Sequence, residues 1–213
     1  MLIKDNFISI KKTLHNINPL TKIVVVTKNQ DKARILQLVN IGHTEFGENK
    51  MQEAKFKWTD LLKTYPGINL HFIGRLQSNK IKEIYSLFNY VHSLDSEKLA
   101  LLFSNLEKKN KKKLKYFIQV NIGNEIQKSG IQILNIKNFI LFCKNLDLNI
   151  LGLMCIPPNN RNVENYFLKL KELNDQFNFT DLSMGMSSDY PLAAKLGATF
   201  VRIGSAIFEE KFN

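Results

Sequence analysis

Short apolar runs alternate with longer amphipathic segments from one end of the chain to the other. The apolar runs are three to six residues long and rich in Val, Ile, Leu and Phe, which is typical of strands buried on both faces. The predicted strands are Ile23–Thr27, His43–Gly47, His71–Gly74, Tyr90–Ser93, Tyr116–Asn121, Leu151–Cys155, Leu182–Met184 and Thr199–Ile203. Each of them is followed by helical or helix-compatible sequence.

The segments between the strands repeat apolar residues at i, i+3 and i+4, which indicates helices packed by one face. The clearest examples are Gln30–Asn40, Met51–Leu62, Glu97–Glu107, Ile131–Asn145 and Val163–Phe177. Ser96 and Asn162 stand where N-terminal caps are expected for two of these helices. A further helix over residues 4–17 is predicted to precede the first strand.

Eight strands that alternate with helices predict parallel βα units. Open doubly wound sheets usually have fewer strands, whereas a closed (β/α)8 barrel has this number, and 213 residues lie at the short end of its size range. No internal repeat or low-complexity linker divides the chain. We therefore predict an α/β fold consisting of a single (β/α)8 TIM barrel with an extra N-terminal helix, one domain over residues 1–213.

Composition places this barrel among soluble proteins. The chain is 44% hydrophobic, but no stretch approaches the ~20 apolar residues of a membrane helix. The N-terminal segment lacks the apolar core and cleavage site of a signal peptide, so a cytoplasmic location is expected. Cys143 and Cys155 have neither metal-ligand spacing nor a secretory context. They are predicted to be reduced, buried thiols, and no metal site is expected.

The formal net charge of +11 raises the possibility of nucleic-acid binding. The lysines are scattered over helix faces, however, and the densest run, Lys108–Lys115, falls between a predicted helix and a predicted strand, where a solvated loop is the simplest interpretation. No zinc-finger spacing, aromatic RNA-binding motif or helix-turn-helix pattern occurs. We therefore do not expect nucleic-acid binding to be the main function.

Candidate chemistry collects at the carboxyl ends of the predicted strands, where barrel enzymes and binding proteins build their sites. Lys28 closes the first strand and Asn49 follows the second. A lysine at a strand end is usually no more than a solvated residue. The turns after strands seven and eight change that interpretation, because a phosphate site commonly forms there.

These two turns read SMGMSSD and RIGSA. The Ser187 hydroxyl and the backbone N–H groups of Gly204 and Ser205 could cradle a phosphate, and a helix beginning near Ala206 would add its positive end. The alternative for Gly204 is a plain strand-to-helix turn.

Arg202 lies within the last predicted strand, on the face opposite Val201 and Ile203, so its side chain is expected to point into the barrel. A buried guanidinium is too costly to leave without a partner. Two partners remain open. One is a structural ion pair with an acid on a neighbouring strand, such as Glu45, and the other is an electron-rich ring nitrogen of a bound ligand.

A lysine, a phosphate cradle and an inward arginine together fit pyridoxal 5'-phosphate. The neutral amine of Lys28 would form a Schiff base with the aldehyde. An arginine facing the pyridine nitrogen would keep that nitrogen unprotonated, whereas an acid would make the ring a strong electron sink. This arrangement weakens general carbanion chemistry.

Eight ordered motifs carry a family resemblance over about residues 20–208. They are TK after a valine strand, FGENxxQE, HFIGxLQSNK, VHSxDS, KSGI, GLMCIPP, LSMGMSxD and GATxVRIGxAIF. The sequence resembles the pyridoxal phosphate homeostasis protein family, which is similar to the N-terminal barrel domain of alanine racemase.

The resemblance implies a barrel that binds pyridoxal phosphate through Lys28. It places Asn49 near the ring and Arg202 at the pyridine nitrogen, and it assigns the phosphate to Ser187, Gly204 and Ser205. Members of the family are regarded as cofactor carriers or regulators of vitamin B6 and amino-acid pools, without an established catalytic activity. Enzymes that require the cofactor are the implied partners.

Departures from the family pattern add cations near the mouth of the barrel. Lys50 stands where an aromatic residue is common, and Arg75 fills a variable position; both could alter how tightly the anionic cofactor sits. Lys80 and Lys128 face the loop side, and a role in cofactor handover stays open. His71 and His92 lie within predicted strands and are interpreted as core or surface histidines with satisfied hydrogen bonds.

The competing interpretation is an enzyme that depends on pyridoxal phosphate, such as an amino-acid racemase. Alanine racemase needs a second, C-terminal domain and a tyrosine from its partner subunit, whereas this chain ends five residues after Phe208. No obvious second base stands opposite Lys28, so proton transfer by two bases would lack one face. We therefore expect a non-catalytic, monomeric carrier.

Overall fold

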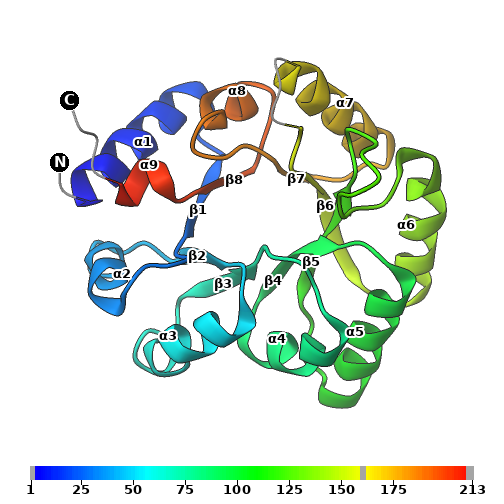
Figure 1. The fold of residues 1–213 in the computed structure, drawn as a ribbon, viewed down its shortest axis with the longest axis horizontal. Helices are drawn as coiled ribbons and strands as arrows, with labels where there is room; N and C mark the ends of the chain where they lie inside the picture. Colours follow the sequence, from blue (N-terminus) through cyan, green and yellow to red (C-terminus); the bar gives the residue numbers. More distant parts are fainter. Residues whose placement is uncertain (1–2, 159–161, 210–213) are drawn as a thin grey trace.

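Eight parallel strands close into a barrel in sequence order, with β8 pairing back onto β1 (Figure 1). The computed structural model describes residues 3–158 and 162–209; the remaining residues of the expected 1–213 domain lie outside this part. The strands are β1 Lys22–Val26, β2 Glu45–Glu48, β3 Asn69–Phe72, β4 Tyr90–Leu94, β5 Lys115–Val120, β6 Asn149–Cys155, β7 Asp181–Ser183 and β8 Phe200–Ile203. The predicted (β/α)8 barrel is confirmed.

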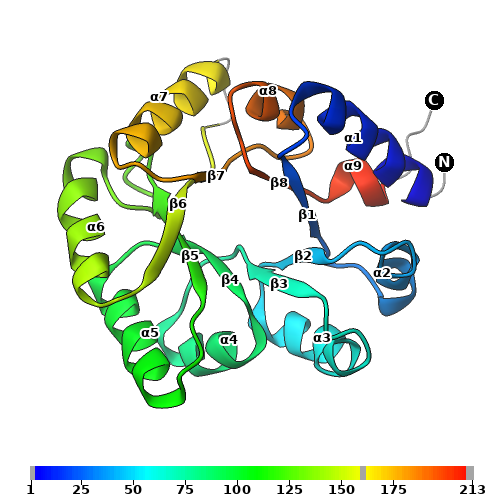
Figure 2. The same cartoon turned by 180° about the vertical axis from the view of Figure 1, so that it is seen from behind.

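Helices surround the barrel on the outside, as the views from both ends show (Figures 1 and 2). They are α1 Ile3–Ile17, α2 Lys32–Val39, α3 Met51–Thr64, α4 Ile81–Leu87, α5 Glu97–Asn110, α6 Ile136–Asn145, α7 Val163–Gln176, α8 Tyr190–Lys195 and α9 Ser205–Phe208, with 3₁₀ turns η1 Ser78–Lys80 and η2 Ile133–Asn135. Because each amphipathic helix buries one face against the strands, the outer core is continuous around the ring.

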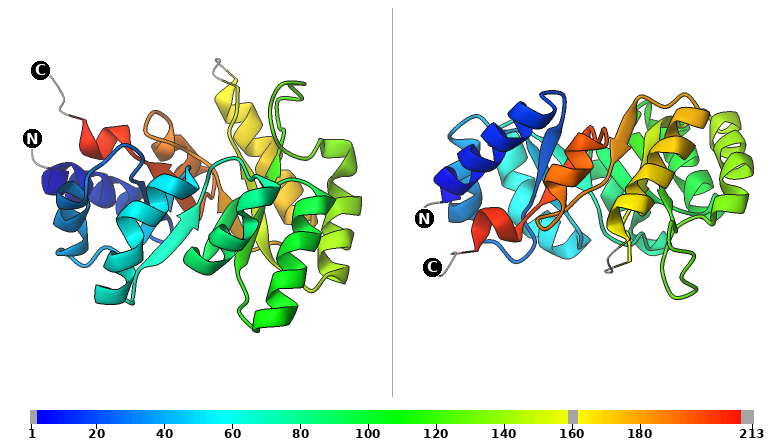
Figure 3. Two further views of the ribbon diagram at one scale, coloured as in Figure 1. Left: turned by 60° about the horizontal axis from the view of Figure 1, so that its bottom comes forward. Right: turned by 90° about the horizontal axis from the view of Figure 1, so that it is seen from above.

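The extra helix α1 packs against α8 and α9, the last two helices of the described residues. The Asn6 side chain donates a hydrogen bond to the Ile207 carbonyl at 3.0 Å. Figure 3 shows α1 and α9 side by side from two further directions. The first and last described elements are thereby joined on one side of the barrel.

The barrel interior is filled by side chains and is not an open channel. Val24, Tyr90, Phe117, Met154 and Phe200 form a separate buried cluster inside it. Strand residues alternate between this cluster and the outer core, since successive side chains point to opposite faces.

Several element boundaries, and one of the two expected helix caps, differ from the sequence expectation. β2 begins at Glu45, two residues later than predicted. The helix expected from Ile131 begins at Ile136, because Ile131 exchanges backbone hydrogen bonds with the loop end of β5 and extends the pairing there. Ser96 caps α5 by accepting from the Leu99 N–H at 3.4 Å, whereas Asn162 makes no side-chain capping bond at α7.

The lysine run expected to be a solvated loop is partly structural. The Lys112 ammonium donates to the carbonyls of Tyr85, Ser86 and Phe88 at 2.8, 3.1 and 3.0 Å, and so satisfies the end of α4. Burial lowers the pKa of Lys112 from its usual value. Part of the positive charge therefore holds helix ends in place.

Two further expectations concern the core and the membrane. Cys143 and Cys155 are free and buried, as predicted, and burial raises the pKa of both thiols to about 12. Within the described ranges, no helix has both the length and the apolar character that crossing a bilayer requires.

Candidate functional site

A cavity of about 770 Å³ opens at the carboxyl ends of the strands. All six site residues predicted from the sequence line it, namely Lys28, Asn49, Ser187, Arg202, Gly204 and Ser205. The other lining residues described are Val26, Asn29, Gln30, Ile73, Ile156, Met186, Ser188 and Glu209. The structure therefore brings together groups from the carboxyl ends of six strands, β1, β2, β3, β6, β7 and β8, although they are spread from Val26 to Glu209 along the chain.

Lys28 follows the end of β1 and has an exposed side chain on the cavity wall. The next residue, Asn29, has a φ of 58°, in the left-handed region that asparagine tolerates better than most residues. The chain thus turns sharply just after Lys28. This turn presents the amine at the mouth of the barrel.

A buried polar network fixes the backbone on both sides of Lys28. The Thr27 hydroxyl donates to Glu48 Oε1 at 2.6 Å, and the Thr27 carbonyl accepts from the Lys57 ammonium at 2.5 Å. Lys57 also pairs with Glu48 at 2.5 Å. On the other side, Glu53 Oε1 accepts the Asn29 N–H at 2.5 Å and pairs with Lys57 at 2.8 Å.

We call this network the Glu48–Lys57–Glu53 clamp; its Glu48–Lys57 part is almost free of solvent, whereas the Glu53 side chain is 23% exposed. The side chains of Lys57 and Glu48 are 4% and 0% exposed. Burial raises the pKa of Glu48 above its usual value, although Lys57 and Thr27 both donate to its carboxylate. An ammonium and two neutral donors converge on one of its oxygens, and these contacts oppose the effect of burial by favouring the ionised carboxylate.

Two unpartnered acceptors face the cavity. Asn49 Oδ1 and Gln30 Oε1 are both buried and accept no hydrogen bond from the described residues. Such orphans are uncommon in folded proteins and require an explanation, such as a ligand that donates to them. Gly74 holds the loop after β3 against the Asn49 backbone, because a Cβ at that position would lie 2.0 Å from the Asn49 carbonyl oxygen.

The turns after β7 and β8 form a compact cradle. Ser187 Oγ accepts the Ala206 N–H at 3.2 Å, which leaves the hydroxyl proton of Ser187 available to a ligand oxygen. The Ser205 N–H, in the first helical residue, has no intrahelical acceptor. The helix begins at Ser205, not near Ala206 as expected, and α9 is a single turn, so little dipole is available.

Gly204 lies where the turn after β8 crosses the end of β1. A Cβ at this position would lie 3.1 Å from the Val26 carbonyl oxygen and 3.3 Å from Val26 Cβ. The glycine therefore lets the cradle approach the strand that leads into Lys28.

Arg202 points into the barrel and is 4% exposed. Its two terminal nitrogens donate to Ser183 Oγ at 2.7 Å and to the Cys155 carbonyl at 2.8 Å. The ion pair with Glu45, one of the two partners left open by the sequence, is wrong. Glu45 begins β2 at the other end of the barrel, where it accepts from His71 at 2.8 Å and Asn69 at 2.7 Å.

The guanidinium of Arg202 keeps donors for a ligand. Burial lowers its pKa from the usual value, yet an arginine remains protonated in proteins. Two of its five N–H groups are used by the contacts above, so three are left, and the residue lines the cavity. Those donors match an acceptor such as an unprotonated ring nitrogen.

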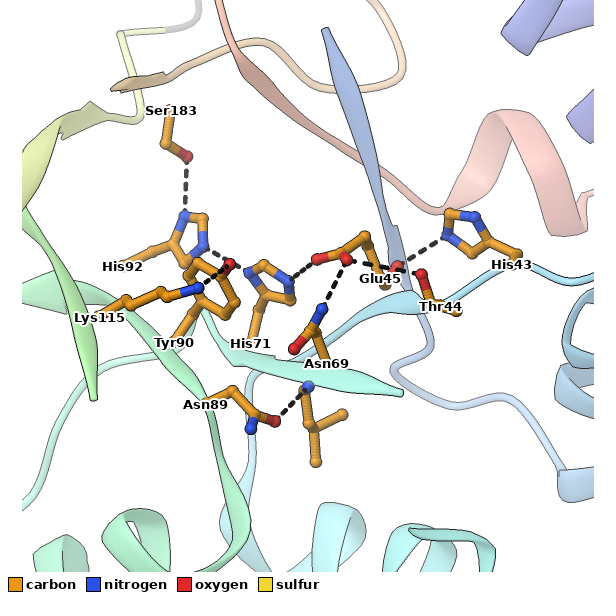
Figure 4. A network of polar contacts seen from close by, with 11 residues as sticks. His43, Thr44, Glu45, Asn69, His71, Asn89, Tyr90, His92, Lys115 and Ser183 are labelled. Carbon is orange, nitrogen blue, oxygen red and sulfur yellow. Dashed lines mark hydrogen bonds and ion pairs between the residues drawn. The ribbon is translucent and has the colours of Figure 1, made fainter. Parts of the chain in front are cut away.

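His71 and His92 are completely buried, with every ring nitrogen in a hydrogen bond, as the interpretation of core histidines predicts. Figure 4 shows the two rings in line between Ser183 and Glu45.

The additional cations lie outside the main cavity. Lys80 pairs with Glu83 at 3.0 Å and Lys128 pairs with Glu125 at 2.6 Å. Lys50, Arg75 and Lys80 line a neighbouring cavity of about 80 Å³ that shares Asn49 with the main one. A basic pocket thus adjoins the site at that residue.

Sequence reasoning missed Gln30, Glu209 and the Glu48–Lys57–Glu53 clamp. Glu48 and Glu53 belong to the motif FGENxxQE, so that motif carried a signal for the clamp. Gln30 was expected to begin the helix Gln30–Asn40, but α2 begins at Lys32 and leaves Gln30 in the preceding loop; Glu209 follows α9, where no periodicity indicates the direction of its side chain.

The fold and the site together define a class of protein, a parallel βα barrel that offers one amine, one buried guanidinium and an anion cradle at the carboxyl ends of its strands. The model of the family described as alanine racemase, N-terminal domain, matches residues 2–211.

Curated relatives cover nearly the whole chain. The pyridoxal phosphate homeostasis protein of Aquifex aeolicus is 37% identical over 200 residues, which are 89% of this chain and 87% of the relative. The protein of the same name from Haemophilus influenzae is 39% identical over 202 residues, 88% and 84% of the two chains. The chain therefore belongs to the alanine racemase N-terminal domain family and, within it, to the pyridoxal phosphate homeostasis proteins.

Solved structures agree with this membership. PipY of Synechococcus elongatus, solved with PLP bound, is 30% identical, has a TM-score of 0.85, and is matched over 97% of this chain and 99% of its own. Alanine racemase from Bartonella henselae shares the fold alone, with a TM-score of 0.78 at 15% identity over 98% of this chain and 58% of its own.

Proposed function

We propose that this protein binds pyridoxal 5'-phosphate reversibly on Lys28 and serves vitamin B6 homeostasis as a non-catalytic carrier. One observation carries the proposal. A single cavity of about 770 Å³ holds an accessible lysine, a buried arginine with spare donors, and the Ser187–Gly204–Ser205 turns. The PLP-bound PipY structure, which covers the same length of chain, supports it.

The residues present fit this cofactor. The phosphate would lie against the Ser187 hydroxyl and the N–H groups of Gly204 and Ser205. The Lys28 amine would condense with the aldehyde, forming one C=N bond and releasing one water. The orphaned Asn49 Oδ1 and Gln30 Oε1 would accept hydrogen bonds from the ring substituents or the lysine nitrogen.

When bound, the cofactor supplies an electrophilic carbon and a conjugated ring that can stabilise a neighbouring carbanion. Arg202 limits the second property. Because a guanidinium only donates, Arg202 would hold the ring nitrogen unprotonated and would leave the ring a weak electron sink.

The polar residues of the cavity also favour storage and transport of the cofactor over catalysis with it. Of the described lining residues, only Lys28, Arg202 and Glu209 carry an ionisable side chain; Arg202 is buried among its hydrogen-bond partners, and Glu209 is an exposed residue that follows α9. We propose that the whole chain acts as one domain, as a cytoplasmic monomer that supplies enzymes requiring the cofactor.

The experiment compares purified wild-type protein with two lysine variants after incubation with pyridoxal phosphate. Wild type and Lys80→Ala, which removes a lysine that does not line the cavity, should show the visible band of a Schiff base. Lys28→Ala should lack it. A Lys28→Ala protein that shows the wild-type band contradicts the proposal.

The enzyme alternative is tested with the same loaded protein. Incubation with L-alanine or D-alanine, followed by chiral chromatography, should reveal no racemisation above free pyridoxal phosphate. Robust interconversion by the pure protein would replace the carrier with a racemase.

A further inference from the structure

A continuous row of hydrogen bonds crosses the interior of the barrel. Its members, in order, are Arg202, Ser183, His92, His71 and Glu45, and we call them the polar chain. The four donor–acceptor distances are 2.7, 2.8, 2.9 and 2.8 Å. Figure 4 shows the part from Ser183 to Glu45, which passes from β7 across to β4 and on through β3 to β2.

The middle of the polar chain is excluded from solvent. Ser183, His92 and His71 are all 0% exposed. The His71 ring stacks on Tyr90 at a centroid distance of 4.2 Å, and the His92 ring stacks on Phe117 at 4.5 Å. Because no water can replace a lost partner there, each polar atom depends on its neighbour in the chain.

The chemistry at the two ends fixes the direction of every bond. Arg202 can only donate, so Ser183 Oγ accepts from it and keeps its own hydrogen to donate to His92 Nδ1; the Glu45 carboxylate can only accept. His92 must then carry its hydrogen on Nε2 and donate to His71 Nδ1. His71 in turn carries its hydrogen on Nε2 and donates to the Glu45 carboxylate.

The opposite direction fails at the acid. It would place a lone pair of His71 Nε2 against the Glu45 carboxylate at 2.8 Å, with no proton between them. Burial also lowers the pKa of both His71 and His92, which keeps the rings neutral. At Glu45, burial alone would raise the pKa, but the hydrogen bonds from His71 and Asn69 outweigh it and hold the pKa below its usual value.

We propose that the polar chain positions Arg202 toward the cofactor ring and balances its buried charge with the carboxylate of Glu45 at the far end of the barrel. This inference rests on the proposed function. Ser183 touches the guanidinium directly and, with the Cys155 carbonyl, sets its plane. His92, His71 and Glu45 act through Ser183, so all four are positioning residues and not catalytic ones.

The far end of the polar chain does not reach the cofactor cavity. Glu45 lies on the wall of a separate cavity of about 710 Å³ at the amino-terminal ends of β1 and β2, beside α1. Its side chain is 16% exposed. Through the hydrogen bonds of the polar chain, a change of charge at Glu45 affects the position of Arg202 from the opposite end of the barrel.

Nitrogen-15 NMR of the histidine side chains tests the direction of the chain in protein without cofactor. At pH 7 both His71 and His92 should be neutral with the hydrogen on Nε2, and His15→Gln and His43→Gln variants assign the other two rings. A hydrogen on Nδ1 alone in either ring, or a doubly protonated ring, overturns the proposed direction.

Release of pyridoxal phosphate tests the positioning role. Ser183→Ala should shift the visible band and speed release about tenfold, the effect of losing one hydrogen bond to a charged group. Ser104→Ala is the matched control, since it also removes a buried serine hydrogen bond, to the Leu146 carbonyl at 3.0 Å, but far from the site. If both variants melt lower than wild type while Ser183→Ala keeps the wild-type band and release rate, the positioning role is wrong.

Variants of Glu45, at the far end of the polar chain, test the positioning role even if Ser183→Ala does not fold. Glu45→Gln can still accept from His71, whereas Glu45→Leu cannot, so release should be faster in Glu45→Leu than in Glu45→Gln. Equal release rates would contradict the transmission from Glu45. A Schiff-base band in Lys28→Ala would instead remove the proposed function and leave the NMR result untouched.

Discussion

Replacing Lys57 with methionine removes the cation at the centre of the Glu48–Lys57–Glu53 clamp. Methionine keeps most of the apolar length of the lysine stem, so the change is chiefly the loss of charge and of three hydrogen-bonding contacts. Those contacts go to Thr27, Glu48 and Glu53. The variant therefore isolates the electrostatic part of the clamp that holds the residues beside Lys28.

The magnitude follows from the burial of the pair. Glu48 is 0% exposed and Lys57 is 4% exposed, so neither charge can be rehydrated in the folded protein. Breaking a buried pair by removing one partner costs about 3–5 kcal/mol, because an uncompensated charge stays behind. For a chain of this size the melting temperature should fall by on the order of 10 °C.

The loss should depend on pH. The folded-state pKa of Glu48 is already raised by burial, and removal of Lys57 raises it further. A carboxyl group whose pKa is raised by folding favours the folded protein at low pH, where it is protonated in both states. This contribution is lost as the pH rises through the folded-state pKa, because the group must then carry its charge in the buried site. The penalty of Lys57→Met should therefore be largest near pH 7.5 and smallest near pH 4.5.

Urea unfolding at the two pH values measures this penalty. Lys63→Met is the matched control, since it lies on the same helix and its pair with Asp60 is 74% and 75% exposed; its stability should equal that of wild type within error. The double variant Lys57→Met/Glu48→Gln should be more stable than Lys57→Met alone. A penalty below about 1 kcal/mol, or one that is the same at both pH values, refutes the reasoning.

Two further predictions concern the cradle and the thiols. Gly204→Ala should weaken pyridoxal phosphate binding at least about tenfold, because the added Cβ would lie 3.1–3.3 Å from Val26 atoms and shift the turn. The control is Gly67→Ala, where nothing lies within 4 Å of the added Cβ; it should bind as wild type does in the same titration. Cys143 and Cys155, with pKa values raised to about 12 by burial, should not react with a thiol reagent at pH 8 until the protein is unfolded, and rapid labelling of the native protein would contradict their burial.

The fold was predictable because its signals are local. Apolar runs, helical periodicity and their alternation are properties of short segments, and eight repeats of the same unit leave few alternatives to a closed barrel. That the six candidate site residues line one cavity was predictable for a related reason. Once the barrel is assumed, every strand end lies at one face, so Lys28 and Gly204 meet without any knowledge of the register.

The partner of Arg202 was not predictable in this way. Side-chain alternation tells which face a residue takes, but not how high it lies along the barrel axis. Arg202 is the third residue of β8 and pairs with Val24, whereas Glu45 is the first residue of β2. Their separation follows from the stagger of the strands, which no local pattern encodes.

The polar chain was hidden for the same reason. His71, His92 and Ser183 each stand at an inward position of a predicted strand, but the contact between β4 and β7 spans the interior of the barrel. Sequence separation of 91 residues carries no signal of that contact. Only the closed geometry brings the serine hydroxyl between a histidine and Arg202.

Identification of the modified lysine tests the central claim most directly. Protein loaded with pyridoxal phosphate is reduced with borohydride, digested and mapped by mass spectrometry. The account predicts one phosphopyridoxyl group per chain, on Lys28, with Lys50, Lys80 and Lys128 unmodified at stoichiometric loading. A label located mainly on any other lysine, or no covalent label on a protein that retains the cofactor, would contradict it.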